Sequence, residues 1–153
     1  MIFTSVAHVA APRDFVFARA CEFDRLARAV EGRGAVVRPG VSALGGPRYD
    51  IEYPFRKAMW PAALELQATN PPGEMQIGIE AAAVTAKAEF AFLVVEAGGT
   101  RVELTATLTP KSMQGRLFLG SLHVVRGRVQ ERLDEDLSAL ARGAEALWQA
   151  QGG

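Results

Sequence analysis

Apolar and polar residues alternate along several segments in the middle of the chain. Between positions 48 and 55, residues 49, 51, 53 and 55 are aromatic or aliphatic, whereas residues 48, 50 and 52 are charged. The same two-residue period runs through 62–69, 74–80, 84–96 and 100–110. Successive side chains of a strand point to opposite faces, so this period predicts strands with one buried and one solvated face. Turn sequences such as Pro71-Pro72-Gly73 separate the segments, which favours an antiparallel meander.

The two ends of the chain have different patterns. Residues 2–9 (IFTSVAHV) predict a first strand, and residues 11–30 predict two short helices, with Asp24 as a candidate cap of the second. Apolar residues spaced by three and four predict one unbroken helix from 121 to 148. A helix of that length needs a broad surface to cover its apolar stripe. We therefore expect it to lie across the apolar face of the sheet.

This order of elements resembles the helix-grip fold of the SRPBCC superfamily, which includes START lipid-transfer domains, the birch-pollen-allergen family and polyketide cyclases. The likeness rests on three loose motifs: VAAPRDFVFARACEFDRL, GTRVELTATLTPK and GRLFLGSLHVVRGRVQERLDEDLSALARGAE. The resemblance implies an α+β domain over residues 1–153. In it, a curved antiparallel sheet of about six or seven strands wraps around the C-terminal helix. It also implies a deep, mostly apolar cavity between the sheet and that helix.

The alternation indicates which side chains face this cavity. The expected ligand-binding residues are Tyr49, Tyr53, Phe55, Leu64, Leu66, Ile77, Ile79, Phe90, Phe92, Leu104, Leu122, Val125 and Val129. Small residues on the same face, such as Ala86, Ala88 and Ala106, would leave room for a ligand. Two alternatives stay open. Large neighbours could fill the space and make the core solid, or a one-residue slip could turn Glu80 or Glu89 inward.

The predicted inner face carries almost no group that ionises near neutral pH. General acid–base catalysis needs a positioned His, Asp, Glu or Lys, so we assign no catalytic residue. Tyr49 and Tyr53 are the polar groups available to orient a ligand. His8, His123 and Cys21 have no metal-ligand spacing, and we expect neither a metal nor another cofactor.

Composition narrows the function further. The chain has 17 basic and 17 acidic residues, and this balance argues against a nucleic-acid partner. The first residues lack the features of a secretory signal, and no apolar run reaches the length of a membrane span. We therefore expect a cytoplasmic protein without stable membrane insertion. The sequence leaves open whether it is a monomer or a homodimer.

Three hypotheses of function follow. The first is a protein that binds or transports a small hydrophobic ligand, such as a lipid, a polyketide or an aromatic compound. The second is a polyketide cyclase or dehydratase-like enzyme that uses the same cavity and accelerates its reaction mainly by positioning the substrate. The third is a regulatory partner domain whose cavity is vestigial. The apolar inner face favours a binding protein over an enzyme.

Overall fold

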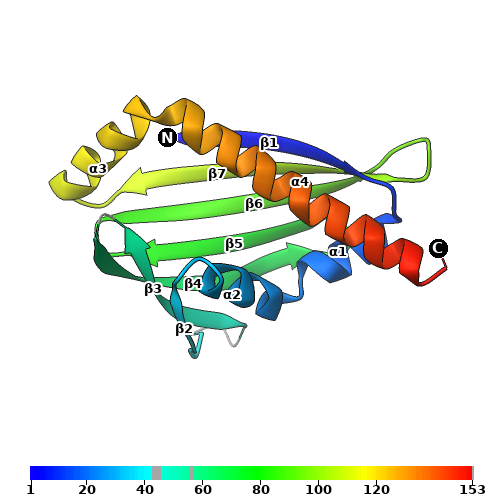
Figure 1. The fold of residues 1–153 in the computed structure, drawn as a ribbon, viewed down its shortest axis with the longest axis horizontal. Coiled ribbons are helices and arrows are strands. Elements are labelled where there is room, and N and C mark those ends of the chain that lie inside the picture. The colour runs from blue at the N-terminus through cyan, green and yellow to red at the C-terminus, as the bar shows by residue number, and fades with distance from the viewer. Residues whose placement is uncertain (43–45, 56, 153) are drawn as a thin grey trace.

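The computed structural model describes residues 1–42, 46–55 and 57–152, without the side chains of residues 55 and 67–69. Within these residues seven strands form one antiparallel sheet, in the order β1-β7-β6-β5-β4-β3-β2. The strands are β1 (Ile2–Val9), β2 (Val36–Pro39), β3 (Arg48–Phe55), β4 (Ala58–Asn70), β5 (Glu74–Ala81), β6 (Val84–Val94) and β7 (Thr100–Pro110). The helices are α1 (Arg13–Ala20), α2 (Phe23–Glu31), α3 (Met113–Val124) and α4 (Arg126–Ala150). Figure 1 shows α4 crossing one face of the curved sheet, which confirms the predicted α+β class.

The strand registers agree with the predicted alternation. Tyr49 pairs with Leu64, Leu64 with Ile79, and Ile79 with Ala86. Ala86 in turn pairs with Leu108, so apolar residues from five neighbouring strands share one face. We call this face, which α4 crosses, the inner face. Glu80, Glu89 and the other charged strand residues point to the outer face.

The N-terminal strand forms one edge of the sheet. β1 pairs with β7 along its whole length, and its other edge is covered by α4. Arg126 Nη2 donates to the carbonyl oxygen of Ile2 at 2.7 Å, and Gln130 Nε2 donates to that of Thr4 at 2.7 Å. The opposite edge strand, β2, has only four residues and ends in Pro39. Both edges are therefore poor templates for pairing with another chain.

The prediction of one unbroken helix from 121 to 148 is wrong. α3 and α4 meet at Val125, whose backbone (φ −106°, ψ 23°) is not helical. Its N–H donates to the carbonyl oxygen of Leu122, three residues back instead of four. The β-branched pair Val124-Val125 and the nearby Gly127 weaken the helix locally. α3 packs on β7 whereas α4 packs on β1, so the break lets each half follow a different strand.

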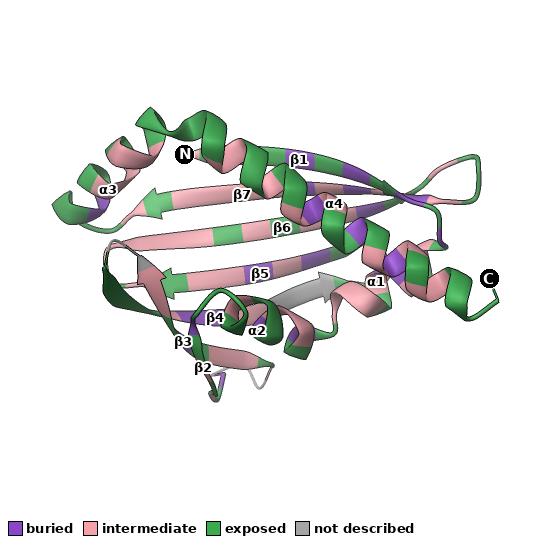
Figure 2. Cartoon of the chain, viewed as in Figure 1, coloured by how far each residue is buried: buried purple, intermediate pink, exposed green. Residues whose placement is uncertain are grey.

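The two short helices predicted after the first strand are confirmed as α1 and α2. α1 packs on β6, where the Phe17 ring meets the edge of Phe92 with centroids 5.5 Å apart. The Phe15 ring lies 5.0 Å from that of Trp148 near the end of α4. The core thus sits between the inner face and helices α1 and α4 (Figure 2). None of the helices in the described residues is long and apolar enough to cross a membrane.

Candidate ligand-binding face

Burial changes along the inner face from one end of the sheet to the other. On β6, Phe92 is fully buried, whereas Ala88 and Ala86, nearer the β5–β6 turn, stay partly exposed. β7 shows the same change between Leu104 and Leu108. Figure 2 shows it as purple toward the C-terminal end of α4 and pink or green toward α3. On β6 and β7 the inner face is therefore packed at one end and incompletely covered at the other, whereas on β4 the order is reversed, with Leu64 buried and Leu66 partly exposed.

We call the incompletely covered part of the inner face the trough. Its members are apolar residues of β4 to β7 that remain partly exposed: Leu66, Ile79, Ala86, Ala88, Phe90, Ala106 and Leu108. Alanines oppose each other in this region, because Ala88 pairs with Ala106 across β6 and β7. Small facing side chains here cover little of the inner face, and Leu66, Ile79, Ala88 and Phe90 pack against the core while staying partly exposed.

The expected ligand-binding residues divide between the core and the trough. Leu64, Ile77, Phe92 and Leu104 are buried in the core. Leu66, Ile79 and Phe90 line the trough, and Tyr49 and Tyr53 lie on the inner face of β3. The side chain of Phe55 lies outside the described part of the chain.

The three residues expected from the long helix are separated by the helix break. Leu122 is on α3 and partly buried, Val125 is at the break and exposed, and Val129 is on the first turn of α4. Because α3 turns away from the line of α4, these residues do not form one stripe over the sheet. The contribution of α4 to the inner face comes instead from its later apolar residues, including Leu133, Leu137 and Ala141.

Tyr49 already has a polar partner. Its hydroxyl donates a short hydrogen bond to Asp24 Oδ1, and its ring stacks on Phe23 with centroids 5.3 Å apart. Asp24 lies in the first turn of α2, where Glu22 occupies the N-cap position instead. The bond to the Asp24 carboxylate favours the protonated phenol and raises the pKa of Tyr49. Tyr49 therefore fastens α2 to the sheet.

Tyr53 lies beside a charged link between two parts of the fold. Arg33, in the turn after α2, donates to Asp136 Oδ1 on α4 at 2.7 Å. This bond is the main cause that raises the pKa of Arg33, and the Tyr53 hydroxyl adds to it. The Arg33–Asp136 pair therefore joins the α2 side of the molecule to α4, and a phenol lies next to it.

Comparisons with known proteins identify similar structures but no matching sequence family. No protein-family model matches the chain, and no curated protein matches it in sequence. Among solved structures, the Zhui aromatase/cyclase from Streptomyces sp. R1128 superposes with a TM-score of 0.71 at 17% identity, over 100% of this chain and 98% of that one. TTHA0849 from Thermus thermophilus gives 0.62 at 19% identity over 100% of both chains. Ara h 8.0201 gives 0.59 at 10% identity over 98% of both.

The chain has the helix-grip fold. The expected resemblance is confirmed at the level of the fold, since the superpositions extend over nearly the whole of both chains. The sequence identities are too low to carry a function from these structures to this chain.

The sequence also singled out one cysteine and two histidines. Cys21 Sγ lies 3.6 Å from Met75 Sδ, and burial raises the pKa of its thiol, which disfavours the reactive thiolate. His8 and His123 are exposed on β1 and α3. No group of His, Cys, Asp and Glu among the described residues is arranged to hold a metal ion.

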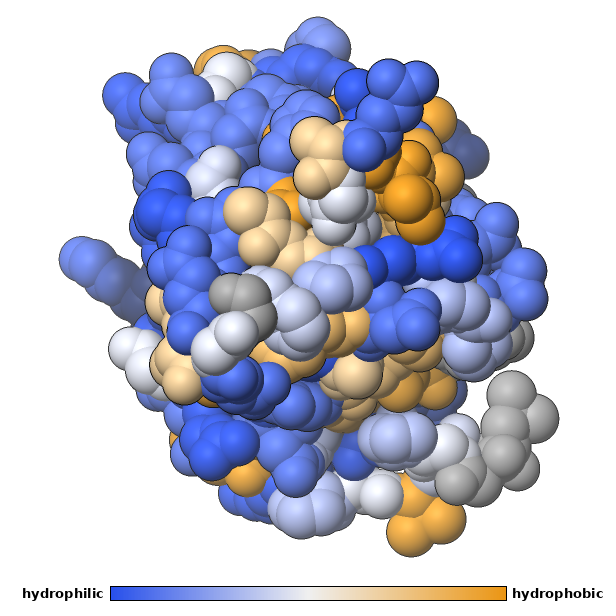
Figure 3. Space-filling model, turned by 90° about the vertical axis from the view of Figure 1, so that its right-hand side faces the viewer, coloured by the Kyte–Doolittle hydropathy of each residue, from blue (hydrophilic) through white to orange (hydrophobic). Residues whose placement is uncertain are grey.

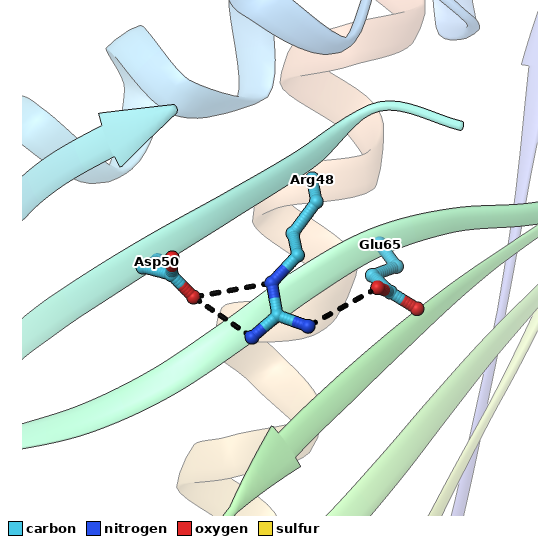
Figure 4. Close-up of polar contacts among 3 residues, drawn as sticks. All are labelled: Arg48, Asp50 and Glu65. Atoms are coloured by element: carbon cyan, nitrogen blue, oxygen red, sulfur yellow. Dashed lines mark hydrogen bonds and ion pairs between the residues drawn. The ribbon is translucent and has the colours of Figure 1, made fainter. Parts of the chain in front are cut away.

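The outer face carries two hollows that the sequence did not indicate. Each has a volume of about 470 Å³, and Arg48, Ala63 and Glu80 border both. Arg48 donates to Asp50 at 3.0 and 3.2 Å and to Glu65 at 3.3 Å (Figure 4). Asp50 first, and then Glu65, raises the pKa of Arg48. Charged pairs lie in the walls of both hollows, and the first hollow also has apolar walls that include Val36, Ile51 and Pro61.

Proposed function

We propose that the chain binds and carries a small hydrophobic molecule in the trough. The observation that carries the proposal is the partial exposure of apolar side chains on the inner face of β5, β6 and β7, inside the concavity of the fold. If the inner face served only to stabilise the fold, we would expect its apolar side chains to be as closely packed as that of Phe92. A ligand that covers them gains roughly 25 cal/mol per Å² of apolar surface before ordering costs.

Shape and size would govern recognition more than hydrogen bonds. Tyr49 is engaged by Asp24, so it offers its ring as a wall, whereas Tyr53 and Arg33 provide polar groups near the link to α4. An elongated or fused-ring molecule with one polar end matches this arrangement. The strands place no acidic or basic side chain on the described inner face, and this composition suits binding.

The first test is native mass spectrometry of the gently purified protein, followed by solvent extraction of any bound molecule. We expect a stoichiometric apolar compound. If the mass is that of the bare chain, titration with the apolar dye anilinonaphthalene sulfonate supplies a second measurement. A dye that binds no better than to an unrelated folded protein would contradict the proposal.

A cyclase or dehydratase-like activity is the second candidate. The superposition with the aromatase/cyclase over the whole chain favours it, and Tyr53 beside Arg33 is the polar pair that such chemistry would use. The substitution Tyr53→Phe separates the two functions. A binding protein should lose only a few-fold in affinity, whereas an enzyme that uses the phenol should lose turnover of a poly-β-ketone substrate while still binding it.

A further inference from the structure

α3 carries apolar residues both on the side that packs against the protein and on the side that faces solvent. Gly115, Phe118 and Leu122 are at least partly buried, and they lie on the side that meets the rest of the protein. Gly115 is so close to the β5–β6 turn that a β-carbon there would lie 2.0 Å from the carbonyl oxygen of Ala83. A surface helix normally turns mainly polar residues to solvent on its other side. α3 turns large apolar residues to solvent as well, beside the exposed Gln114, Arg116 and His123.

The solvent side of α3 carries a row of large apolar residues. Met113 and Leu117 are each 68% exposed, and Val124 is 85% exposed. Their spacing of four and seven places all three on one side of the helix. We call these three residues the α3 ridge. α3 lies at the arrowhead end of β7 (Figure 1), and its ridge residues stay exposed.

The stretch of sequence that contains the ridge carries charge of one sign. No Asp or Glu occurs between positions 104 and 130, whereas Lys111, Arg116, Arg126 and Arg128 fall in this stretch. Lys111 bonds Glu80, and Arg126 bonds a carbonyl oxygen of β1. In the described residues, Arg116 and Arg128 form no ion pair. Although the net charge of the whole chain is zero, Arg116, Arg126 and Arg128 give this end of the molecule a local excess of positive charge.

A second element adds apolar groups at the same end of the sheet. The β3–β4 turn brings Met59 and Trp60 to this end, where they are 46% and 49% exposed. The strand registers place that turn at the same end as the β5–β6 turn that α3 contacts. Tryptophan is enriched where proteins meet the headgroup region of a bilayer. The opposite end of the molecule is largely hydrophilic with apolar patches among the polar residues (Figure 3), and Leu93 and Val94, near the β6–β7 turn, are 42% and 64% exposed.

We propose that the α3 end docks the protein peripherally onto an anionic lipid surface. The α3 ridge would enter the boundary between headgroups and acyl chains, and Arg116 and Arg128 would meet lipid phosphates. A second copy of this chain fits less well, because it would bring the same basic residues together. The trough is uncovered toward this same end, so docking would turn its open side toward the bilayer. The docking itself does not depend on the proposed ligand.

Co-sedimentation with lipid vesicles tests the proposal. We expect the protein to bind vesicles of phosphatidylcholine and phosphatidylglycerol, to bind phosphatidylcholine alone much less, and to dissociate at high salt. Leu117→Gln should weaken binding to the anionic vesicles at least about tenfold. Arg116→Gln should weaken it about fivefold, the effect of roughly one basic side chain near such a surface.

Matched controls are available on α4. Leu140 is 65% exposed, so Leu140→Gln removes a comparably exposed apolar residue away from the ridge, and Arg142→Gln removes an exposed charge. Both controls should bind vesicles like the unmodified protein. Far-UV circular dichroism checks that each variant is folded, and Met113→Gln serves as a second ridge variant.

Three outcomes would overturn the proposal. The first is an absence of binding to anionic vesicles, and the second is binding that ridge and control variants share equally. The third is a dimer in sedimentation equilibrium that Leu117→Gln abolishes, because the ridge would then be covered by a second copy. If the protein binds vesicles but does not bind the apolar dye, the docking proposal stands and the proposed ligand-binding function is contradicted. The two proposals can therefore be refuted independently.

Discussion

The role of Tyr49 differs from the one that its residue type and position suggest. Tyr49 looks like a group placed to meet a ligand, because it is a phenol on an apolar face. Its hydroxyl instead bonds the Asp24 carboxylate and ties α2 to β3. An aromatic residue with one polar atom can serve as wall and fastener at once.

The Tyr49–Asp24 bond predicts a pH-dependent contribution to stability. Tyr49→Phe should lower the free energy of unfolding by about 1 kcal/mol near neutral pH, because one hydrogen bond is lost. The folded state raises the pKa of this phenol, so its contribution is present below about pH 10 and is lost as the pH rises through the folded-state value. Urea unfolding of both proteins at pH 7 and above pH 10 should show the difference shrink. A constant difference would contradict the assignment.

Ala88 tests whether the trough is the binding surface. Ala88→Phe places a ring over the trough, where the present side chain is partly exposed and faces Ala106. We expect binding of anilinonaphthalene sulfonate to fall at least about tenfold, because the ring occupies the apolar surface that the dye would cover. Ala91→Phe, on the outer face of the same strand, is the control and should leave dye binding unchanged. Equal binding by both variants would place the dye elsewhere.

At the scale of elements, the glycines of α3 show how closely a helix can approach a turn. Gly115 has the carbonyl oxygen of Ala83 where its β-carbon would stand, whereas Gly120 has open space. Gly120→Ala should therefore stabilise the protein by up to about 1 kcal/mol through helix propensity. Gly115→Ala should destabilise it by several kcal/mol, roughly 2 or more, because α3 must move off the β5–β6 turn. Thermal unfolding of both variants measures the contrast, and shifts of the same sign would refute it.

The sequence predicted the sheet well because alternation is a local signal. Each strand from Arg48 to Pro110 has one apolar face, and antiparallel pairing joins those faces without further information. The helix break at Val125 was missed, because the apolar spacing of three and four continues through it. The break is set by α3 and α4 packing on different strands, which is a tertiary effect. The sequence also could not indicate that Asp24 reaches Tyr49, since no local pattern links α2 to β3.

At the scale of the whole molecule, the inner face is held between two helical parts. α4 packs on β1 at one edge of the sheet, and α2 lies by β2 at the other. Arg33 and Asp136 connect these parts by an ion pair whose two side chains are each 38% exposed. A pair this exposed contributes little to global stability, though it restrains how α2 sits relative to α4.

Removing this pair should loosen α2 selectively. Asp136→Asn is expected to lower the free energy of unfolding by less than about 1 kcal/mol. It should nevertheless speed amide hydrogen exchange in α2, because local openings need less energy than global unfolding. Exchange in β6 and β7 should stay unchanged. Glu135→Gln, an exposed neighbour on α4, is the control, and faster exchange in the sheet as well would argue against a local restraint.

The position of β1 has a consequence for how the chain is made. β1 leaves the ribosome before the other strands of the sheet. Its partner among the described strands is β7, so Val9 cannot pair until Thr100 has been synthesised. Contacts between such distant parts of a chain are expensive to form, which slows folding. During synthesis the apolar residues of β1 stay without their partner until most of the sheet has appeared. β1 is therefore the part of the nascent protein that we expect to be most prone to aggregation. The fold is completed when α4 covers that strand.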